Sequence, residues 1–313
     1  MKNPFIYSND NKRYHTFNYY LKNTYQNKIF KVPLDAGFTC PNRDGKVAYG
    51  GCTFCSALGS GDSVIRSDDL MMQYDEGVKM MRNKWPSGKG MAYFQAYTNT
   101  YGPLERLKEL FEPFILREDV VALCVATRAD CLNDENIEYL NSLTKHKDVW
   151  VEVGLQSIHD ETAKRINRGH DYACFLEAIH KLSKTNLKIC VHVINGLPYE
   201  TKDMMIETIK EISKLPIHAV KIHMLHLIKN TKLAKEYEEK PFHLLTQEEY
   251  VEIVCEQLTY LPKEIVLERL TGDGIASDLI APIWTIKKVM VLNEIDKYMA
   301  KNELYQGMKI DSK

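Results

Sequence analysis

The sequence predicts an α/β fold built on a curved, barrel-like sheet of parallel strands. Six short runs rich in β-branched residues alternate with amphipathic stretches of helical length, an order typical of parallel strands joined by right-handed crossovers. Several of these runs are continuously apolar, as expected of strands covered on both faces. Neither GxGxxG after a strand nor GxxxxGK[ST] occurs, which disfavours an open nucleotide-binding sheet. In a barrel-like sheet we expect the reactive groups at the C-terminal ends of the strands.

The expected elements follow one another in β-α order. Strands are expected at residues 29–36, 91–97, 120–127, 149–156, 187–194 and 219–227. Helices are expected at residues 67–85, 103–114, 134–145, 171–184 and 201–214. Ser67, Asn133 and Thr201 are residue types that cap helix N-termini, and each stands at the start of an expected helix.

We divide the chain into three parts. Residues 1–28 form a basic and aromatic N-terminal segment, residues 29–228 the barrel, and residues 229–313 a helical C-terminal extension packed on it. Within the extension, Thr246 and Glu249 have the spacing of a capping box for a helix over 246–260. A further strand at 265–270 and a final helix at 282–301 are also expected there.

Composition limits the class of protein. The 313 residues include 44% hydrophobic and 27% charged residues, which is typical of a globular protein. The formal net charge of −1 disfavours a protein that binds nucleic acid over most of its surface, so any contact with nucleic acid must be local. The longest apolar run, 120–126, is too short to cross a bilayer, and the N-terminus lacks a signal-peptide pattern. We therefore expect a cytoplasmic protein without membrane contact, whose eight cysteines are thiols or metal ligands.

Three cysteines form the sharpest motif. Cys40, Cys52 and Cys55 have the spacing C-x11-C-x2-C and lie in a glycine-rich loop directly after the first expected strand. The residues alone leave three possibilities open: a four-iron, four-sulfur cluster with one iron lacking a protein ligand, a zinc ion with a fourth ligand such as His15, or unrelated buried thiols. An open coordination position is typical of a metal that does chemistry. The remaining cysteines stand singly and are expected in the core: Cys124, Cys131, Cys174, Cys190 and Cys255.

The cysteine loop and the motifs that follow it resemble the radical S-adenosylmethionine (SAM) superfamily. These motifs are Cys-Thr-Phe-Cys at 52–55, Gly-Leu-Gln-Ser at 154–157, Arg-Ile-Asn-Arg-Gly-His at 165–170 and His-Val-Ile-Asn-Gly-Leu-Pro at 192–198. The resemblance implies a partial (β/α)6, TIM-like barrel in which the three cysteines hold a 4Fe-4S cluster and SAM chelates the open iron. It further implies that an electron from a reductant such as flavodoxin or ferredoxin cleaves SAM to a 5′-deoxyadenosyl radical, which abstracts hydrogen from the substrate.

Within the superfamily, the later motifs resemble the branch that contains oxygen-independent coproporphyrinogen oxidase and the Elongator catalytic subunit. This resemblance implies that Gln156 contacts the ribose of SAM and Arg168 its carboxylate. It places Phe54 and Ile194 beside the adenine and His192 near the ribose. Taken alone, Arg168 also fits a surface charge at a helix end, and His192 also fits a hydrogen-bonded core histidine.

A narrower resemblance rests on FQAYTNT at 94–100, ATRADCL at 126–132 and the C-terminal TGDG…APIW…K pattern. These segments are similar to the YhcC/YtqA group, for which the MnmL name is used. The resemblance implies a tRNA enzyme that converts the 5-carboxymethylaminomethyl group of the wobble uridine to 5-aminomethyl, ahead of a methyltransferase. The substrate is expected to meet four residues, among which a cation would face its carboxylate: Tyr97, Arg269, Asp273 and Lys287. Exposed surface charges are the competing interpretation of the last three.

Direct sequence support for RNA is confined to residues 1–32, where six Lys and Arg accompany one Asp. Aromatic residues lie between them: Tyr7, Tyr14, Phe17, Tyr19, Tyr20 and Tyr25. Basic groups with stacking aromatics suit a single-stranded RNA loop, but the same pattern fits a helix packed on the barrel. Two other functions stay open: a radical SAM enzyme acting on a small-molecule acid, and a non-enzymatic zinc-binding module.

Overall fold

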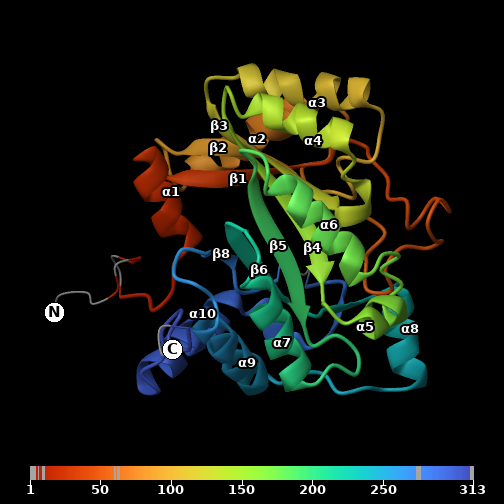
Figure 1. Cartoon of the computed structure of the whole chain (residues 1–313), viewed down its shortest axis with the longest axis vertical. Coiled ribbons are helices and arrows are strands. Elements are labelled where there is room, and N and C mark those ends of the chain that lie inside the picture. Colours follow the sequence, from red (N-terminus) through yellow and green to blue (C-terminus); the bar gives the residue numbers. More distant parts are fainter. Residues whose placement is uncertain are drawn as a thin grey trace.

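A seven-stranded, all-parallel sheet curls into a half-barrel at the centre of the fold (Figure 1). The computed structural model describes Phe5, Tyr7, Ser8 and residues 11–59, 61, 64–272 and 276–310. The strand order is β1-β2-β3-β4-β5-β6-β8. The strands are β1 (Ile29–Leu34), β2 (Lys89–Phe94), β3 (Val120–Arg128), β4 (Asp148–Gln156), β5 (Lys188–Asn195), β6 (Ala219–Met224) and β8 (Val266–Arg269). The expected partial barrel is therefore confirmed.

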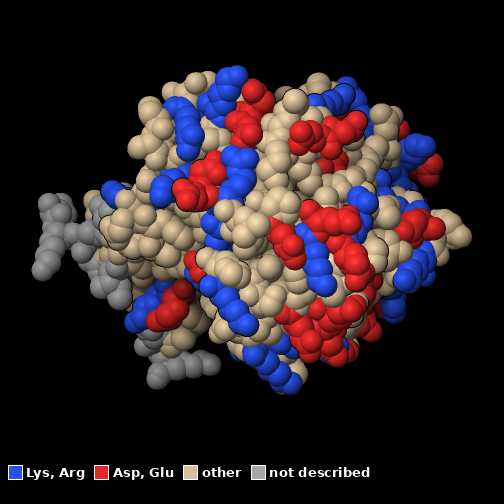
Figure 2. Space-filling model, turned by 90° about the horizontal axis from the view of Figure 1, so that it is seen from above, with Lys and Arg blue, Asp and Glu red and all other residues tan. Residues whose placement is uncertain are grey.

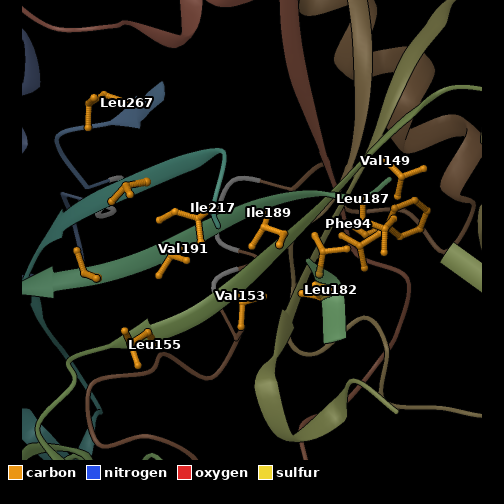
Figure 3. Packing of buried hydrophobic residues seen from close by; sticks show 14 of the residues in the cluster. Phe94, Val149, Val153, Leu155, Leu182, Leu187, Ile189, Val191, Ile217 and Leu267 are labelled. Carbon is orange, nitrogen blue, oxygen red and sulfur yellow. The ribbon is translucent and has the colours of Figure 1, made fainter. Parts of the chain in front are cut away.

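Helices cover the outer face of the sheet (Figure 1). They are α2 (Leu70–Arg82), α3 (Leu104–Leu116), α4 (Asp134–Leu143), α6 (Tyr172–Leu182), α7 (Lys202–Ile212), α9 (Gln247–Thr259) and α10 (Lys288–Lys301). Two shorter helices, α5 (Asp160–Arg165) and α8 (Lys232–Glu239), lie near the C-terminal ends of the strands. The alternating outward residues of β4 and β5, among them Val149, Val153 and Ile189, pack under these helices in one large apolar cluster (Figure 3). Because every second strand residue points outward, the intervening residues face the barrel interior.

Two details of the fold differ from expectation. The segment assigned to the C-terminal extension supplies β8, which pairs in parallel with β6 and adds a seventh strand to the six expected. The helix after the cysteine loop is capped by Asp69 instead of Ser67, because the Asp69 carboxylate accepts hydrogen bonds from the backbone N–H groups of Met71 and Met72. The caps at Asn133 and Thr201 and the capping box at Thr246 are confirmed.

The N-terminal aromatic residues are mostly packing residues. Helix α1 (Phe17–Tyr25) lies against the N-terminal end of the barrel, where the rings of Phe17 and Tyr20 meet the buried Trp150 at centroid distances of 5.8 and 5.7 Å. Lys188 Nζ donates to Tyr20 Oη at 2.8 Å, and Tyr25 Oη donates to Asp148. Tyr7 and Tyr14 are also buried. These contacts support the packing interpretation of the aromatic stripe, one of the two that the sequence leaves open.

The barrel interior is layered. Inward-facing apolar residues of four strands, Met91, Trp150, Cys190 and Ala219, form a dry layer above α1. Two residues further along each strand, at the next inward-facing position, the side chains are charged or polar. They are Lys31, Tyr93, Glu152, His192, Lys221 and Glu268. Beyond this ionic layer lie the C-terminal ends of the strands. No described helix is long and apolar enough to cross a membrane.

Helix α1 closes the N-terminal end of the barrel, and Leu21 is buried in that contact. Leu21→Ala should therefore lower the free energy of unfolding by about 2–5 kcal/mol, because the leucine side chain loses its contacts and leaves a cavity. Urea unfolding followed by circular dichroism measures the change. Asn23→Ala, on the exposed side of the same helix, should change the free energy of unfolding by no more than about 0.5 kcal/mol. Equal effects of the two substitutions would contradict this role of α1.

Candidate active site

A single cavity at the C-terminal ends of the strands gathers most of the expected site residues. All three cysteines of the loop line it. So do seven further residues singled out from the sequence: Phe54, Tyr97, Gln156, Arg168, His192, Ile194 and Arg269. Two do not join them: Lys287 is exposed and does not line the cavity, and Asp273 lies outside the described residues. Residues from both edges of the sheet therefore share one site.

The cysteine loop is fixed to the segment that follows α5. Thr53 N donates to Ile166 O at 2.9 Å, and Gly51 O accepts from Asn167 Nδ2 at 2.8 Å. The buried Asn42 amide donates to Asn167 O and also lies 3.7 Å from Cys52 Sγ. Its Oδ1 atom has no partner among the described residues. The loop is thus held in place by one backbone hydrogen bond and by side-chain amides, one of which also approaches the Cys52 thiol.

Positive charge surrounds the three thiols. Guanidinium groups of Arg43, Arg128 and Arg168 act electrostatically on them. Burial and the neighbouring Cys52 raise the pKa of Cys55 to about 11, while Arg43 opposes that shift. The shift favours the protonated thiol of Cys55, and a metal centre would supply the positive charge that stabilises the thiolate form. This donor set, with its arginines, fits an iron–sulfur cluster.

The zinc alternative finds no fourth ligand. Among the described residues, no three His, Cys, Asp or Glu side chains converge closely enough to hold a single metal ion. His15, the suggested fourth ligand, lies outside the cavity, with Nδ1 3.0 Å from Lys263 O near the start of β8.

Arg168 is a buried cavity residue and not a surface charge at a helix end. Its exposed fraction is 5%, and one guanidinium nitrogen donates to Gly154 O while the other terminal nitrogen lies 4.0 Å from Cys52 Sγ. A side-chain carbon at Gly154 would lie 3.1 Å from the guanidinium, so glycine permits this close approach. The Nε atom of Arg168 is buried without a partner in the described chain, which leaves a donor for a bound anion.

Gln156 and an apolar wall flank the arginine. The β4–β5 register shifts between Gly154 and Gln156, and Gln156 has a positive φ of 76° at the cavity. Phe54, from the cysteine loop, and Ile194, from β5, pack against the same apolar cluster, which includes Ile166 and Leu197. The cavity therefore has a flat apolar side next to polar groups, a combination that suits an adenosine moiety.

Glu152 forms the centre of the ionic layer beneath the cavity. Its carboxylate accepts from Lys31 and Lys221, and His192 Nε2 donates to it at 2.9 Å. Burial disfavours the charged form, but Lys221 and Lys31 outweigh it and hold the pKa of Glu152 well below its usual range. Burial and the positive charge of Lys221 lower the pKa of His192. His192 thus is a hydrogen-bonded histidine that also lines the cavity.

Sequence reasoning missed this layer, although a signal was present. Lys31, Glu152 and Lys221 each interrupt a strand whose other residues are mostly apolar. Their spacing puts them on the inward face, opposite the outward core residues. A charge at such a position of a buried strand needs a partner on a neighbouring strand, and that pattern could have identified the network.

The segment after β2 serves mainly the fold. Asn99 is fully buried, and its amide donates to three carbonyl groups, those of Phe94, Ala96 and Ala126, each at 3.0 Å. Tyr97 has a positive φ of 60° and donates from its hydroxyl to Ala57 O at 2.7 Å, which holds the loop that follows Cys55. Its ring lies beneath Arg43, 5.4 Å from the guanidinium carbon.

Comparisons with family models, related sequences and solved structures point to the same protein family. The model of the radical SAM superfamily matches residues 40–212, and that of the Radical_SAM C-terminal domain matches residues 217–301. The uncharacterized protein YtqA of Bacillus subtilis (strain 168) is 49% identical over 97% of this chain and 95% of its own. A tRNA uridine(34) acetyltransferase of Methanocaldococcus infernus is 29% identical over 59% of this chain and 34% of its own. The structure of the archaeal M. infernus Elp3 shares the fold, with a TM-score of 0.65 at 20% identity, over 90% of this chain and 64% of that one.

Breaking the ionic layer should cost stability. We expect Glu152→Gln to lower the free energy of unfolding at pH 7 by about 3 kcal/mol, because two buried lysines lose a charged partner. Urea unfolding tests this, with the exposed Glu138→Gln as the control that should not change the midpoint. Folding lowers the pKa of Glu152, so its contribution is complete above about pH 4.5 and is lost as the pH falls below that value. Equal stability of wild type and Glu152→Gln at pH 7 would refute the assignment.

Proposed function

The chain belongs to the radical SAM superfamily, and from this premise we propose that it modifies the wobble uridine of tRNA, converting the 5-carboxymethylaminomethyl side chain to 5-aminomethyl. One observation carries the proposal: a single cavity joins the cysteine loop to an arginine, Arg269, on the opposite edge strand. Such a cavity suits a substrate with an acidic end. The similarity to an enzyme named for tRNA uridine 34, and the fold shared with Elp3, support tRNA as the substrate class.

As a radical SAM enzyme, the protein uses a 4Fe-4S cluster and S-adenosylmethionine. Cys40, Cys52 and Cys55 would hold the cluster. When both are bound, they supply a 5′-deoxyadenosyl radical that abstracts a hydrogen atom. A non-enzymatic zinc-binding module is inconsistent with this family. The carbon between the amine nitrogen and the carboxylate of the substrate is the position from which we expect abstraction, because both neighbours stabilise a radical there. The substrate radical would return one electron to the oxidised cluster and become an imine. Water would then hydrolyse the imine, which breaks the C–N bond and releases the aminomethyl group and a two-carbon oxo acid.

The residues of the chain bind and orient SAM. Phe54 and Ile194 form the apolar wall against which the adenine would stack, and Gln156 would hold the ribose. Arg168 presents a buried guanidinium with an unused Nε donor, which is suited to the carboxylate of SAM. His192 lies between the cavity and Glu152, so its ring is held in one orientation while it faces the ribose.

On the substrate side, the proposal uses Tyr97 and Arg269, which line the cavity. Positive and negative side chains are mixed over the described residues of the face in Figure 2, and acidic side chains gather at its lower right. We infer that tRNA is bound locally, around the cavity mouth, where an extruded wobble base would enter. The reaction also requires a one-electron reductant, such as flavodoxin or ferredoxin. A methyltransferase acting on the product amine would follow.

A second candidate is a radical SAM enzyme acting on a free small-molecule acid. The formal net charge of −1 favours it, because a tRNA-binding protein is commonly more basic. The same cavity would accept the acid without any RNA contact. The two candidates differ in whether a nucleoside of tRNA changes when the protein is removed.

Replacing one cysteine tests the cluster assignment. Cys55→Ala, purified without oxygen, should lose the brown colour of the cluster and cleave no SAM, because two thiolates do not retain the cluster. Iron analysis and detection of 5′-deoxyadenosine are the measurements. Cys174→Ala, outside the cavity, should retain both properties. SAM cleavage by Cys55→Ala at the rate of wild type would refute the assignment.

Deleting the gene tests the substrate. Mass spectrometry of tRNA nucleosides should show the 5-carboxymethylaminomethyl wobble uridine accumulating and its aminomethyl derivatives disappearing. A plasmid carrying wild type should restore the profile, and one carrying the Cys55→Ala variant should not. Unchanged wobble uridines would reject the tRNA substrate and favour the small-molecule acid.

A further inference from the structure

The cysteine loop and the segments beside it carry exposed apolar and aromatic side chains outside the cavity. Val47 is 44% exposed and Tyr49 is 80% exposed. Tyr199, which follows β5, is 53% exposed, and the guanidinium carbon of Arg165 lies 4.3 Å from the centroid of its ring. None of these four residues lines the cavity. Together with four neighbouring lysines we call them the outer surface, and these lysines are Lys46, Lys164, Lys232 and Lys235.

Three segments that are distant in the sequence meet beneath the outer surface. Asn167 Nδ2, just after α5, donates to Tyr49 O at 3.2 Å. Thr53 N donates to Ile166 O at 2.9 Å, and Thr53 O accepts from Leu233 N of α8 at 2.8 Å. The end of α5, the cysteine loop and the first turn of α8 therefore lie side by side, at the right of Figure 1.

The outer surface is close to the thiols along the chain. Tyr49 precedes Cys52 by three residues, so their Cα atoms are at most about 11 Å apart. The amide of Asn167 donates to the carbonyl groups of both Tyr49 and Gly51, and Gly51 adjoins Cys52. A molecule bound on the outer surface is thus separated from the thiols by little more than the loop itself.

Basic side chains surround the apolar centre of the outer surface. All of them are exposed, and they come from the three segments that meet there: Lys46, Lys164, Arg165, Lys232 and Lys235. Residues 43–49, 160–165 and 229–236 contain seven Lys or Arg and four Asp or Glu, although the whole chain has a formal net charge of −1. Positive charge is therefore concentrated beside the cysteine loop.

Only part of this positive charge is balanced by neighbouring carboxylates. Lys164 Nζ pairs with Glu161 at 2.7 Å, and Lys232 Nζ lies 3.8 Å from Glu236. The other three basic side chains form no ion pair within the described part of the chain, and they are Lys46, Arg165 and Lys235. The excess charge is complementary to an acidic partner, and an apolar centre with a polar rim is the usual composition of a protein interface.

We propose that the outer surface docks the acidic one-electron carrier protein that reduces the cluster. One electron passes from the carrier to the oxidised cluster, so the carrier is oxidised by one electron and the cluster reaches the reduced state from which SAM is cleaved. Because the outer surface lies outside the cavity, the carrier does not occupy the place of SAM or substrate. This inference goes beyond the proposed function, since it rests on membership of the radical SAM superfamily and holds for either substrate.

RNA is the other polyanion that these basic side chains could attract. Two observations favour a protein. The outer surface contributes nothing to the cavity that receives the substrate, and its centre includes an aliphatic side chain, Val47, which gains from apolar burial but offers no ring for base stacking. Contact with a carrier also needs only a small, transient interface, as is usual for redox partners.

Stopped-flow absorbance tests the docking through the second-order rate constant for reduction of the oxidised cluster by flavodoxin hydroquinone. For wild type this rate constant should fall as salt is raised, because ions screen the attraction between the basic surface and the acidic flavodoxin. Arg165→Glu and Lys235→Glu should each lower it by about 10-fold at low ionic strength. Both substitutions should weaken flavodoxin binding, measured by isothermal titration calorimetry, to a similar degree. Lys145→Glu, an exposed position before the start of β4 at the opposite end of the barrel, should change neither quantity.

Dithionite separates docking from damage to the cluster, because this small reductant needs no protein interface. With dithionite, Arg165→Glu and Lys235→Glu should be reduced and should cleave SAM at the wild-type rate, with wild-type iron content and unfolding temperature. The proposal is wrong if flavodoxin does not reduce wild type, if salt and charge reversal leave its rate constant unchanged, or if reduction by dithionite falls equally. It is also wrong if the variants lose affinity for an anticodon stem-loop but are still reduced normally by flavodoxin, because the outer surface would then bind RNA.

Discussion

The buried ion pairs inside the barrel set the shape of the molecule. β1 and β8 are the edge strands of the sheet and do not pair with each other, yet Lys31 on β1 contacts both Glu268 on β8 and Glu152 on β4. Lys221 on β6 reaches the same two carboxylates. Because an uncompensated buried charge is costly, these groups are satisfied only if the sheet curls until its edges face one another. The curvature in turn brings the cysteine loop and Arg269 to one cavity.

This layering also explains how the site is isolated. Helix α1 and the apolar layer around Trp150 close the barrel from its N-terminal end, and the ionic layer forms the floor of the cavity above them. These two layers therefore close the cavity to water from its N-terminal end. A site that generates a reactive radical requires such exclusion, because it prevents side reactions. The same floor holds His192 through Glu152, so the structural network and the cofactor site share a residue.

Most of the fold and much of the site could be predicted from the sequence because the relevant signals are local. Strand alternation, helix caps such as Asn133 and the C-x11-C-x2-C loop are patterns within a few residues. The features that were missed depend on contacts between distant segments. A strand at 265–270 is expected from the sequence, but its pairing with β6 is not encoded in its own residues. The N-terminal aromatics leave packing and RNA stacking both open, because aromatic residues serve either role. Lys287 and Lys288 differ by one position, yet Lys287 is exposed and Lys288 is half-buried, because the turn at the start of α10 sets which side chain points outward.

The central claim is that three cysteines hold a cluster with one iron open to SAM. Electron paramagnetic resonance of the anaerobically reduced wild-type protein tests it most directly. We predict the signal of a reduced 4Fe-4S cluster whose shape changes when SAM is added, because the sulfonium cofactor binds the open iron. A cluster signal that SAM leaves unchanged, or a protein that carries zinc and no iron, would contradict the account.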